Sequence, residues 1–427
     1  MRHIFYIVIF SLPLFSTSLD EIISHALANS TTIKVAQAES ELAKLQTKVS
    51  KANRFGELNL VGDATHYNID RTLAPMTPNT IKSGKAITTS KEIYSAGVSY
   101  NIPMFTGFAQ TRDVEISEIA SKMSEIKQKL TKEQLIYNIR SLYLAILTQQ
   151  EMKKAQHSYT KALKKLSNTI AYEVELGKKA EIDLIKSKVD IQLAQTTEKV
   201  LKTNIKTTKA TLSALTDLEV KTIDKLDIKV SEPTYNLNEL FAQNNTLAKI
   251  QMDEMALQKA DKLIAKSKSA NLPQLNLNSY LGKNYGEDDK LDDWDDETLW
   301  QVGVNFKYNL LDFGKRDATV QKAKIGRLQA TLKKEQTLLD LKKLLIQAVG
   351  KIEQSYAQYL GNSTAYRLSK KSEKIENVRY KSDVATLNDY LLAKGKTELS
   401  LAKLIESKYE YQKNIYYLDY LLEKGEK

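Results

Sequence analysis

The sequence predicts a mainly α-helical protein with a small β part, built from two copies of one plan. Residues 94–102 alternate apolar and small polar side chains, which is the period-two pattern of a β-strand with one apolar face. The pattern returns 206 residues later, at 300–308, and each copy leads into a helical pattern too long for an ordinary globular domain. Only 15 glycines and 6 prolines occur among 427 residues, a composition that favours long helices. Internal duplication explains these observations together.

The N-terminal residues 1–18 have the features of a cleaved signal peptide. A short basic start, Met1-Arg2-His3, is followed by an apolar run at 4–15 and then by serine and threonine residues. We expect cleavage near Ser18 and a mature chain outside the cytoplasm. A membrane anchor is the alternative, but the run is short and Pro13 interrupts it.

Composition excludes several classes of site and partner. The chain has no cysteine, which excludes disulfides, thiolate metal sites and lipid attachment through an N-terminal cysteine. The formal charge of +11 would elsewhere suggest a nucleic-acid partner. Here lysines such as Lys161 and Lys164 interleave with glutamates such as Glu173 along a predicted helix, and no nucleic-acid motif accompanies them. We therefore expect solvated helix faces, no nucleic-acid partner, no cofactor and, with four scattered histidines, neither a metal site nor an enzyme.

The first repeat is predicted to span 19–216. Its elements are a helix at 19–52, strands at 57–67 and 93–102 around a loop at 68–92, and helices from about 108 to 176 and about 180 to 215. A coiled-coil-like seam steps by four, three and four residues through Leu135, Ile139, Leu142 and Ile146.

A linker at 217–236 leads to the second repeat, predicted to span 237–427. Its elements are a helix at 237–270, strands at 274–285 and 299–308, a helix from about 314 to 381 and a last helix to about 422. Its seam is Leu338, Leu341, Leu345, Ala348 and Ile352. The loop 286–297 has eight acidic residues among twelve but lacks the glycine and spacing of a calcium loop. We therefore favour a solvated extracellular loop over a divalent-cation site.

The predicted lengths constrain the architecture. Each long helix of about 68 residues spans roughly 100 Å at 1.5 Å per residue, and two shorter helices stacked end to end match it. Strands of about ten residues cross a bilayer when tilted. Four strands cannot close a barrel and open edges are not tolerated in lipid, so several chains must share one barrel. Two chains would give an eight-stranded barrel whose interior is filled by side chains, and three chains would give a twelve-stranded barrel with a channel. The sequence pattern does not decide how many chains share the barrel.

The strand-to-helix turns repeat as well. We expect Pro103 to end strand pairing and Gly107 to form the turn in the first repeat. Asp312 and Gly314 occupy the corresponding turn in the second repeat.

These features together resemble the outer-membrane efflux proteins of the TolC type over residues 19–427. The resemblance rests on Ile102-Pro103-Met104-Phe105-Thr106-Gly107, on its copy Leu310-Leu311-Asp312-Phe313-Gly314, and on two breaks in equal register, Gly177-x5-Asp183-x3-Ser187 and Asp383-x5-Asp389-x3-Ala393. It implies a homotrimer with a twelve-stranded β-barrel in the outer membrane and a helical barrel in the periplasm. It also implies a non-enzymatic exit duct of a tripartite drug- or metal-efflux pump or a type I secretion system, docked through a periplasmic membrane-fusion adaptor to an inner-membrane transporter.

The resemblance also implies a gate at the periplasmic helix tips. Asp183 matches an acidic residue of the first tip, Tyr380 matches the tyrosine that pairs with it, and Asp389 matches a carboxylate ringing the pore. Ala385 and Leu392 stand where the family has an arginine link and a second acidic ring, which weakens the expected gate. The residues expected to contact the adaptor are Leu176, Gly177, Lys178, Asp383, Val384 and Ala385.

Simpler interpretations remain open for these residues and for the whole chain. Asp183 and Asp389 can be carboxylates that stabilise helix N-termini, and Tyr380 can serve packing alone. A periplasmic coiled-coil adaptor or scaffold without a membrane barrel is the alternative function. It would need a lipoyl-like β module rich in glycine and valine, which the sequence lacks, and it would not need four bilayer-length strands.

Overall fold

The computed structural model describes residues 18–84, 87–288, 293–382 and 384–425. Most of the predicted signal peptide and the predicted tip residue Asp383 lie outside this part of the chain. The predicted fold class is confirmed, since long helices accompany one small antiparallel sheet and the element order repeats. Ser18 is described, and it begins the first helix by exchanging hydrogen bonds with Glu21.

Apart from α3, which has no counterpart among the described elements of the second repeat, the elements of the two repeats follow the same order. The first repeat contains α1 (Leu19–Asn29), α2 (Thr31–Ala52), β1 (Glu57–Thr72), α3 (Pro78–Lys82), β2 (Thr89–Phe105), α4 (Ala109–Glu175) and α5 (Glu181–Thr216). The second contains α6 (Leu237–Ala242), α7 (Ala248–Lys268), β3 (Gln274–Asp288), β4 (Asp293–Lys307), α8 (Lys315–Lys381) and α9 (Leu387–Leu421).

The chain forms two compact units. The helical unit comprises residues 18–37, 127–251 and 336–425, and the strand unit comprises residues 38–126 and 252–335. No helix in the described ranges is both long and apolar enough to cross a membrane.

Both predicted seams lie in the cores of the helical unit. Leu135, Ile139 and Ile146 belong to one buried cluster with residues of α1 and α5, and Leu142 packs against it. Leu341, Leu345, Ala348 and Ile352 belong to a second cluster with residues of α9, and Leu338 packs against that cluster.

Two tyrosines fix the linker to these cores. The buried Tyr143 donates a hydrogen bond from its hydroxyl to the Asp224 carbonyl at 2.8 Å, and burial raises the pKa of that hydroxyl to about 12. Tyr411 donates in the same way to the Ser231 carbonyl at 2.8 Å. The predicted connector is therefore attached to the helices at both of these points.

Two predicted helices are interrupted. The helix expected at 19–52 breaks at Ser30, whose backbone is not helical and whose hydroxyl donates to the Leu215 carbonyl at 3.1 Å. The helix expected at 237–270 divides into α6 and α7, with a 3₁₀ turn at Asn244–Thr246 and extended backbone at Leu247 between them. The Ser30 hydroxyl and the Ala248 N–H at the start of α7 both bond to residues distant in the sequence, which a local pattern does not contain.

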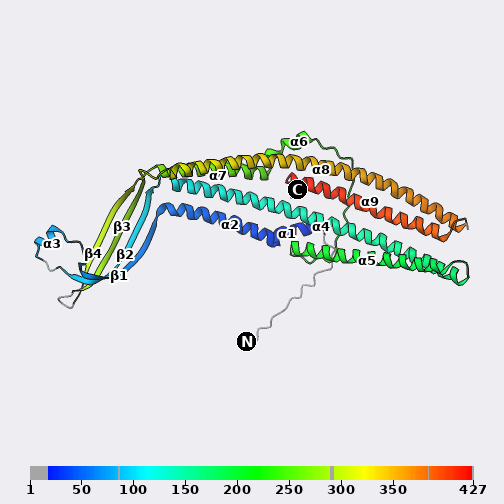
Figure 1. Ribbon diagram of the computed structural model, residues 1–427, viewed down its shortest axis with the longest axis horizontal. Coiled ribbons are helices and arrows are strands. Elements are labelled where there is room, and N and C mark those ends of the chain that lie inside the picture. The colour runs from blue at the N-terminus through cyan, green and yellow to red at the C-terminus, as the bar shows by residue number, and fades with distance from the viewer. Residues whose placement is uncertain (1–17, 85–86, 289–292, 383, 426–427) are drawn as a thin grey trace, which may run out of the picture. The chain divides into compact units, whose positions relative to one another are not determined.

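The sheet is an antiparallel meander in the order β1-β2-β3-β4. Figure 1 shows the four strands side by side, with α3 beyond their ends, in the connection from β1 to β2. One row of paired residues runs Leu60, Val98, Leu281 and Trp300 across all four strands, and the adjacent row runs Asn59, Ser99, Tyr280 and Gln301. Since neighbouring rows point to opposite faces, one face is mainly apolar and the other mainly polar.

The strands exceed their predicted lengths. They contain 16, 17, 15 and 15 residues, so β1 extends to Thr72, β2 begins at Thr89, and all the described residues of the predicted acidic loop belong to β3 or β4. Polar residues at these ends hide the strand pattern, although the hairpins continue to pair. The prediction for Pro103 is also wrong, because β2 continues to Phe105 with a register shift after Pro103. Proline is compatible with a strand at such an irregularity.

Four helices of the strand unit lie in the order of the strands that they join (Figure 1). The ion pair Lys51–Glu118 (2.8 Å) links α2 to α4, and Lys262–Glu115 (3.1 Å) links α7 to α4. Arg327–Asp261 (2.5 Å) links α8 to α7. Within the strand unit α2 and α8 are therefore the outer helices of a layer α2-α4-α7-α8.

Candidate functional site at the helix tips

The first predicted tip is a tight turn between α4 and α5. Gly177 has a positive φ of 67°, and the Lys178 N–H donates to the Glu173 carbonyl at 2.8 Å. This is the glycine-dependent way to end a helix, because a β-carbon disfavours that backbone conformation. Lys179 forms an ion pair with Glu173 at 2.8 Å, so the turn is also held by charge.

Asp183 is the third residue of α5. The residue that caps this helix, Ala180, has no side-chain hydroxyl and makes no capping bond. Within the described ranges the half-buried Asp183 carboxylate has no hydrogen-bond or ion-pair partner. It remains favourably placed for the helix dipole and available to a group outside this chain.

Asp389 occupies the matching position of α9 but has partners. Its carboxylate accepts hydrogen bonds from the Thr386 N–H at 3.0 Å and the Thr386 hydroxyl at 2.7 Å, while its own N–H donates to that hydroxyl oxygen at 3.2 Å. The hydroxyl bond and then the backbone bond lower the pKa of the exposed Asp389 carboxyl. The interpretation as a helix N-terminal carboxylate is therefore confirmed for Asp389.

Tyr380 does not meet Asp183 in the described part of the chain. It stacks on Tyr390 of α9, with ring centroids 6.0 Å apart and planes at 8°. The packing role of Tyr380 is thus present within one chain, whereas a link to Asp183 stays a prediction. The sequence analysis missed Tyr390, which lies ten residues from Tyr380 and one after Asp389.

The residues expected to contact an adaptor are mostly accessible. Leu176 and Val384 are exposed apolar side chains, and Lys178 is exposed. The N–H groups of Val384 and Ala385 both donate to the Arg379 carbonyl, at 2.9 and 3.3 Å, so the second tip is closed by backbone bonds. Asp383 lies outside the described residues.

The strand-to-helix turns use equivalent backbone in the two repeats. Gly107 and Phe108 have φ of 61° and 68°, and Phe313 and Gly314, 206 residues later, have φ of 51° and 87°. Asp312 begins α8 by accepting from the Arg316 N–H at 3.1 Å and pairing with its guanidinium at 2.8 Å. Gly107, Asp312 and Gly314 therefore have the predicted turn roles, and only Pro103 does not.

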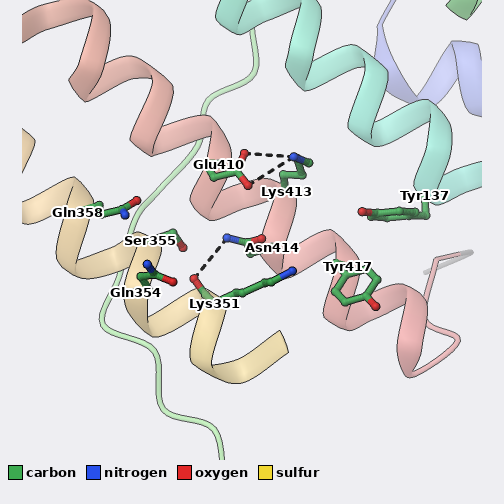
Figure 2. Close-up of a pocket in the computed structure, with 9 residues that line it drawn as sticks. All are labelled: Tyr137, Lys351, Gln354, Ser355, Gln358, Glu410, Lys413, Asn414 and Tyr417. Atoms are coloured by element: carbon green, nitrogen blue, oxygen red, sulfur yellow. Dashed lines mark hydrogen bonds and ion pairs between the residues drawn. The ribbon is translucent and has the colours of Figure 1, made fainter. Parts of the chain in front are cut away.

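A polar groove of about 320 Å³ lies between α4, α8 and α9 in the helical unit, and Figure 2 shows its lining. Glu410 pairs with Lys413 at 3.2 Å, Asn414 donates to the Lys351 carbonyl at 3.3 Å, and Tyr137 lies 5.5 Å from Tyr417 between ring centroids. These groups satisfy one another. Among the described residues there is also no group of three or more acidic or histidine side chains that could hold a metal ion.

Comparison with known proteins agrees with the geometry. Residues 22–217 match the family model described as outer membrane efflux protein. A comparison with curated proteins found no match.

Solved channels share the fold along nearly the whole chain. The Campylobacter jejuni CmeC outer membrane channel is 18% identical, with a TM-score of 0.80 over 95% of this chain and 86% of that one. Vibrio cholerae VceC is 14% identical, with a TM-score of 0.76 over 95% of each chain. The open state of the Neisseria gonorrhoeae MtrE channel is 16% identical, with a TM-score of 0.75 over 95% of this chain and 89% of that one.

The family match covers the first repeat, and the structural likeness extends the same fold through the second. Together they confirm the resemblance and the outer-membrane location predicted from the sequence: the chain is similar to the outer membrane efflux proteins and has the fold of their channels.

Proposed function

We propose that this protein is a trimeric outer-membrane channel that acts as the exit duct of a tripartite efflux pump. The observation that carries the proposal is the four-stranded sheet, which has one apolar face, one polar face and two unpaired edges, β1 and β4. Trp300, Val302 and Val304 are more than half exposed on the apolar face. An exposed surface of this kind is favourable in lipid and unfavourable in water.

The unpaired edges imply that copies of the chain complete the barrel. Backbone groups at an open edge cannot be left unpaired in lipid. Two copies would give eight strands and an interior filled by side chains, whereas three give twelve strands and leave a channel. The polar face, with Ser99, Asn101 and Gln301, would then line water.

The helix tips supply a gate in this proposal. Three copies of Asp183 and three of Asp389 around one axis would favour cations near the constriction. The unpaired carboxylate of Asp183 supports a link across tips, because it has no partner among the described residues of its own chain. Adaptor and inner-membrane transporter would engage the exposed tip residues Leu176 and Val384.

Planar-bilayer conductance of the purified protein tests the proposal. Wild type should show small, cation-preferring conductance, and the Asp183→Ala variant combined with Tyr380→Phe should conduct more. Unchanged conductance in this variant would reject the gate at these residues and keep the channel. Folded protein that neither inserts nor conducts, and that is absent from the outer-membrane fraction, would reject the channel in favour of the periplasmic scaffold.

The proposal includes no catalytic step. The match to the family model described as outer membrane efflux protein supports efflux more directly than type I secretion, whose cargo is a protein, and both uses need the same duct. Drug, metal-ion or protein cargo would be selected by the inner-membrane partner.

A further inference from the structure

An open groove of about 790 Å³ runs along α7 and α8 in the strand unit. The two helices lie side by side (Figure 1), and the ion pair Arg327–Asp261 joins them. The lining is mainly apolar, and its apolar members are Met123 of α4 with Ala256, Ala260, Leu263, Ala270, Ala323, Gly326 and Ala330. A β-carbon at Gly326 would meet nothing within 4 Å, so a further group can lie against α8 at this level.

The groove has a charged end and an apolar length. The chain runs along α7 toward the sheet and along α8 away from it, so Lys266 and Lys322 both line the end nearest the sheet. From Lys266 back to Ala256 the lining covers about 15 Å of α7 at 1.5 Å per residue. A lipid chain spans half of the roughly 30 Å hydrocarbon core of a bilayer, which is also about 15 Å. The apolar length therefore matches one alkyl chain.

The charge of the groove is entirely positive. Lys259, Lys266 and Lys322 line it, and none of the described lining residues is acidic. Lys266 pairs with Asp113 at 2.5 Å, whereas Lys259 and Lys322 have no ion-pair partner within the described ranges. An ammonium beside an apolar surface attracts a ligand that carries both an anionic group and a hydrocarbon part.

We propose that this groove binds a single-chain anionic amphiphile of the fatty-acid class. The carboxylate lies at the end nearest the sheet, where it pairs with the Lys322 ammonium. The alkyl chain follows the apolar length past Leu263 and Gly326, which removes apolar surface of both partners from water. Lys259 lays its methylene stem along the chain and keeps its ammonium in water. The inference goes beyond the proposed channel, because such binding requires only the fold of the strand unit of one chain.

Photolabelling with a diazirine-bearing palmitate tests the site directly. The full-length protein is labelled in nanodiscs of phosphatidylcholine, and the labelled peptides are mapped by mass spectrometry. The label should concentrate on residues 256–270 and 319–330. Unlabelled palmitate should compete roughly tenfold better than hexadecanol, which has the same chain without the charge. Equal competition by hexadecanol, or a label spread evenly over the helices, would overturn the proposal.

One variant tests the place of the chain. Gly326→Leu fills the groove and should abolish labelling of its lining. Gly361→Leu is the matched control on the same helix, because a β-carbon at either glycine meets nothing within 4 Å and Gly361 does not line the groove. Unchanged labelling in Gly326→Leu would contradict binding in the groove.

A second variant tests the place of the charge. Lys322→Gln should weaken palmitate binding about tenfold, because the carboxylate loses a charged partner. Lys324→Gln is the control, since Lys324 is exposed on α8 outside the lining and its loss should leave binding unchanged. Equal weakening by both substitutions would assign the effect to net charge and overturn the site. Loss of the label in nanodiscs of phosphatidylglycerol would assign the groove to a membrane phospholipid and overturn the fatty-acid class.

Discussion

Thr386 and Asp389 hold each other at the start of α9 through three reciprocal hydrogen bonds of 2.7 to 3.2 Å. The matching position in the first repeat, Ala180, cannot form this arrangement, although Asp183 corresponds to Asp389. The two tips thus share a backbone plan, but the start of α9 has a side-chain cap and the start of α5 has none.

Replacing Thr386 by alanine should loosen the first turn of α9. The substitution removes the hydroxyl that bonds both to the Asp389 N–H and to its carboxylate, so the Asp389 N–H in the first turn of the helix loses its acceptor. Hydrogen exchange measured by mass spectrometry should become several-fold faster over 387–392 and stay unchanged over 181–186. Ala180→Thr is the complementary variant and should slow exchange at the start of α5. Equal exchange in wild type and Thr386→Ala would contradict the capping role.

The same pair predicts a pH dependence. The folded pKa of Asp389 is lowered from its ordinary value of 3.8, so the ionised form stabilises the helix start. That stabilisation is fully present above about pH 3.8 and is lost as pH falls through the lowered pKa. Amide exchange at 387–392, corrected for intrinsic rates, should therefore be constant from pH 7 to pH 5 and rise only at more acidic pH. The Asp389→Asn variant should lack this rise.

Glu423 joins the end of α9 to the start of α7. Its nearly buried carboxylate accepts from the N–H groups of Ala248 and Lys249 at 2.8 and 3.0 Å and pairs with Lys129 at 3.3 Å. Glu423→Ala should lower the free energy of unfolding by about 2–3 kcal/mol, because two helix N-terminal amides lose a charged acceptor. Thermal or denaturant unfolding of the helices checks this.

Lys129→Ala provides the control for that measurement. The Lys129 ammonium is about half exposed, so its loss should cost less than about 1 kcal/mol. A loss for Lys129→Ala as large as that for Glu423→Ala would assign the effect to the ion pair instead of the helix start.

Gly97 leaves room for Tyr280 on the polar face of the sheet. A β-carbon at Gly97 would come within 2.8 Å of the Tyr280 ring and within 2.6 Å of the Leu281 carbonyl oxygen. Gly97→Val should destabilise the folded protein by about 1–3 kcal/mol, since the neighbouring strand must move. Gly303→Val is the matched control on the same face, because a β-carbon there meets nothing within 4 Å. Thermal unfolding in detergent should show a larger loss of stability for Gly97→Val than for Gly303→Val. Similar losses of stability in the two variants would rule out crowding by Tyr280 as the cause.

Several features of this protein follow from local sequence periodicity. The seam residues Leu135 and Leu341 are buried as their spacing predicts, and the turns at Gly177 and Gly314 take positive φ. Side-chain periodicity and the steric freedom of glycine act over a few residues, so these features can be read from the sequence alone. The same reasoning predicted the alternating faces of the strands at 94–102 and 300–308.

Tertiary structure decided the features that depend on distant partners. Ser30 ends a helix by bonding to Leu215, Tyr380 stacks on Tyr390, and Glu423 caps the distant helix that begins at Ala248. The strands extended beyond their predicted ends because cross-strand hydrogen bonds, such as those that hold β3 to β4, continue through polar residues. Periodicity records which face of an element is buried, but the partner that occupies that face, or terminates the element, is fixed only when the chain folds.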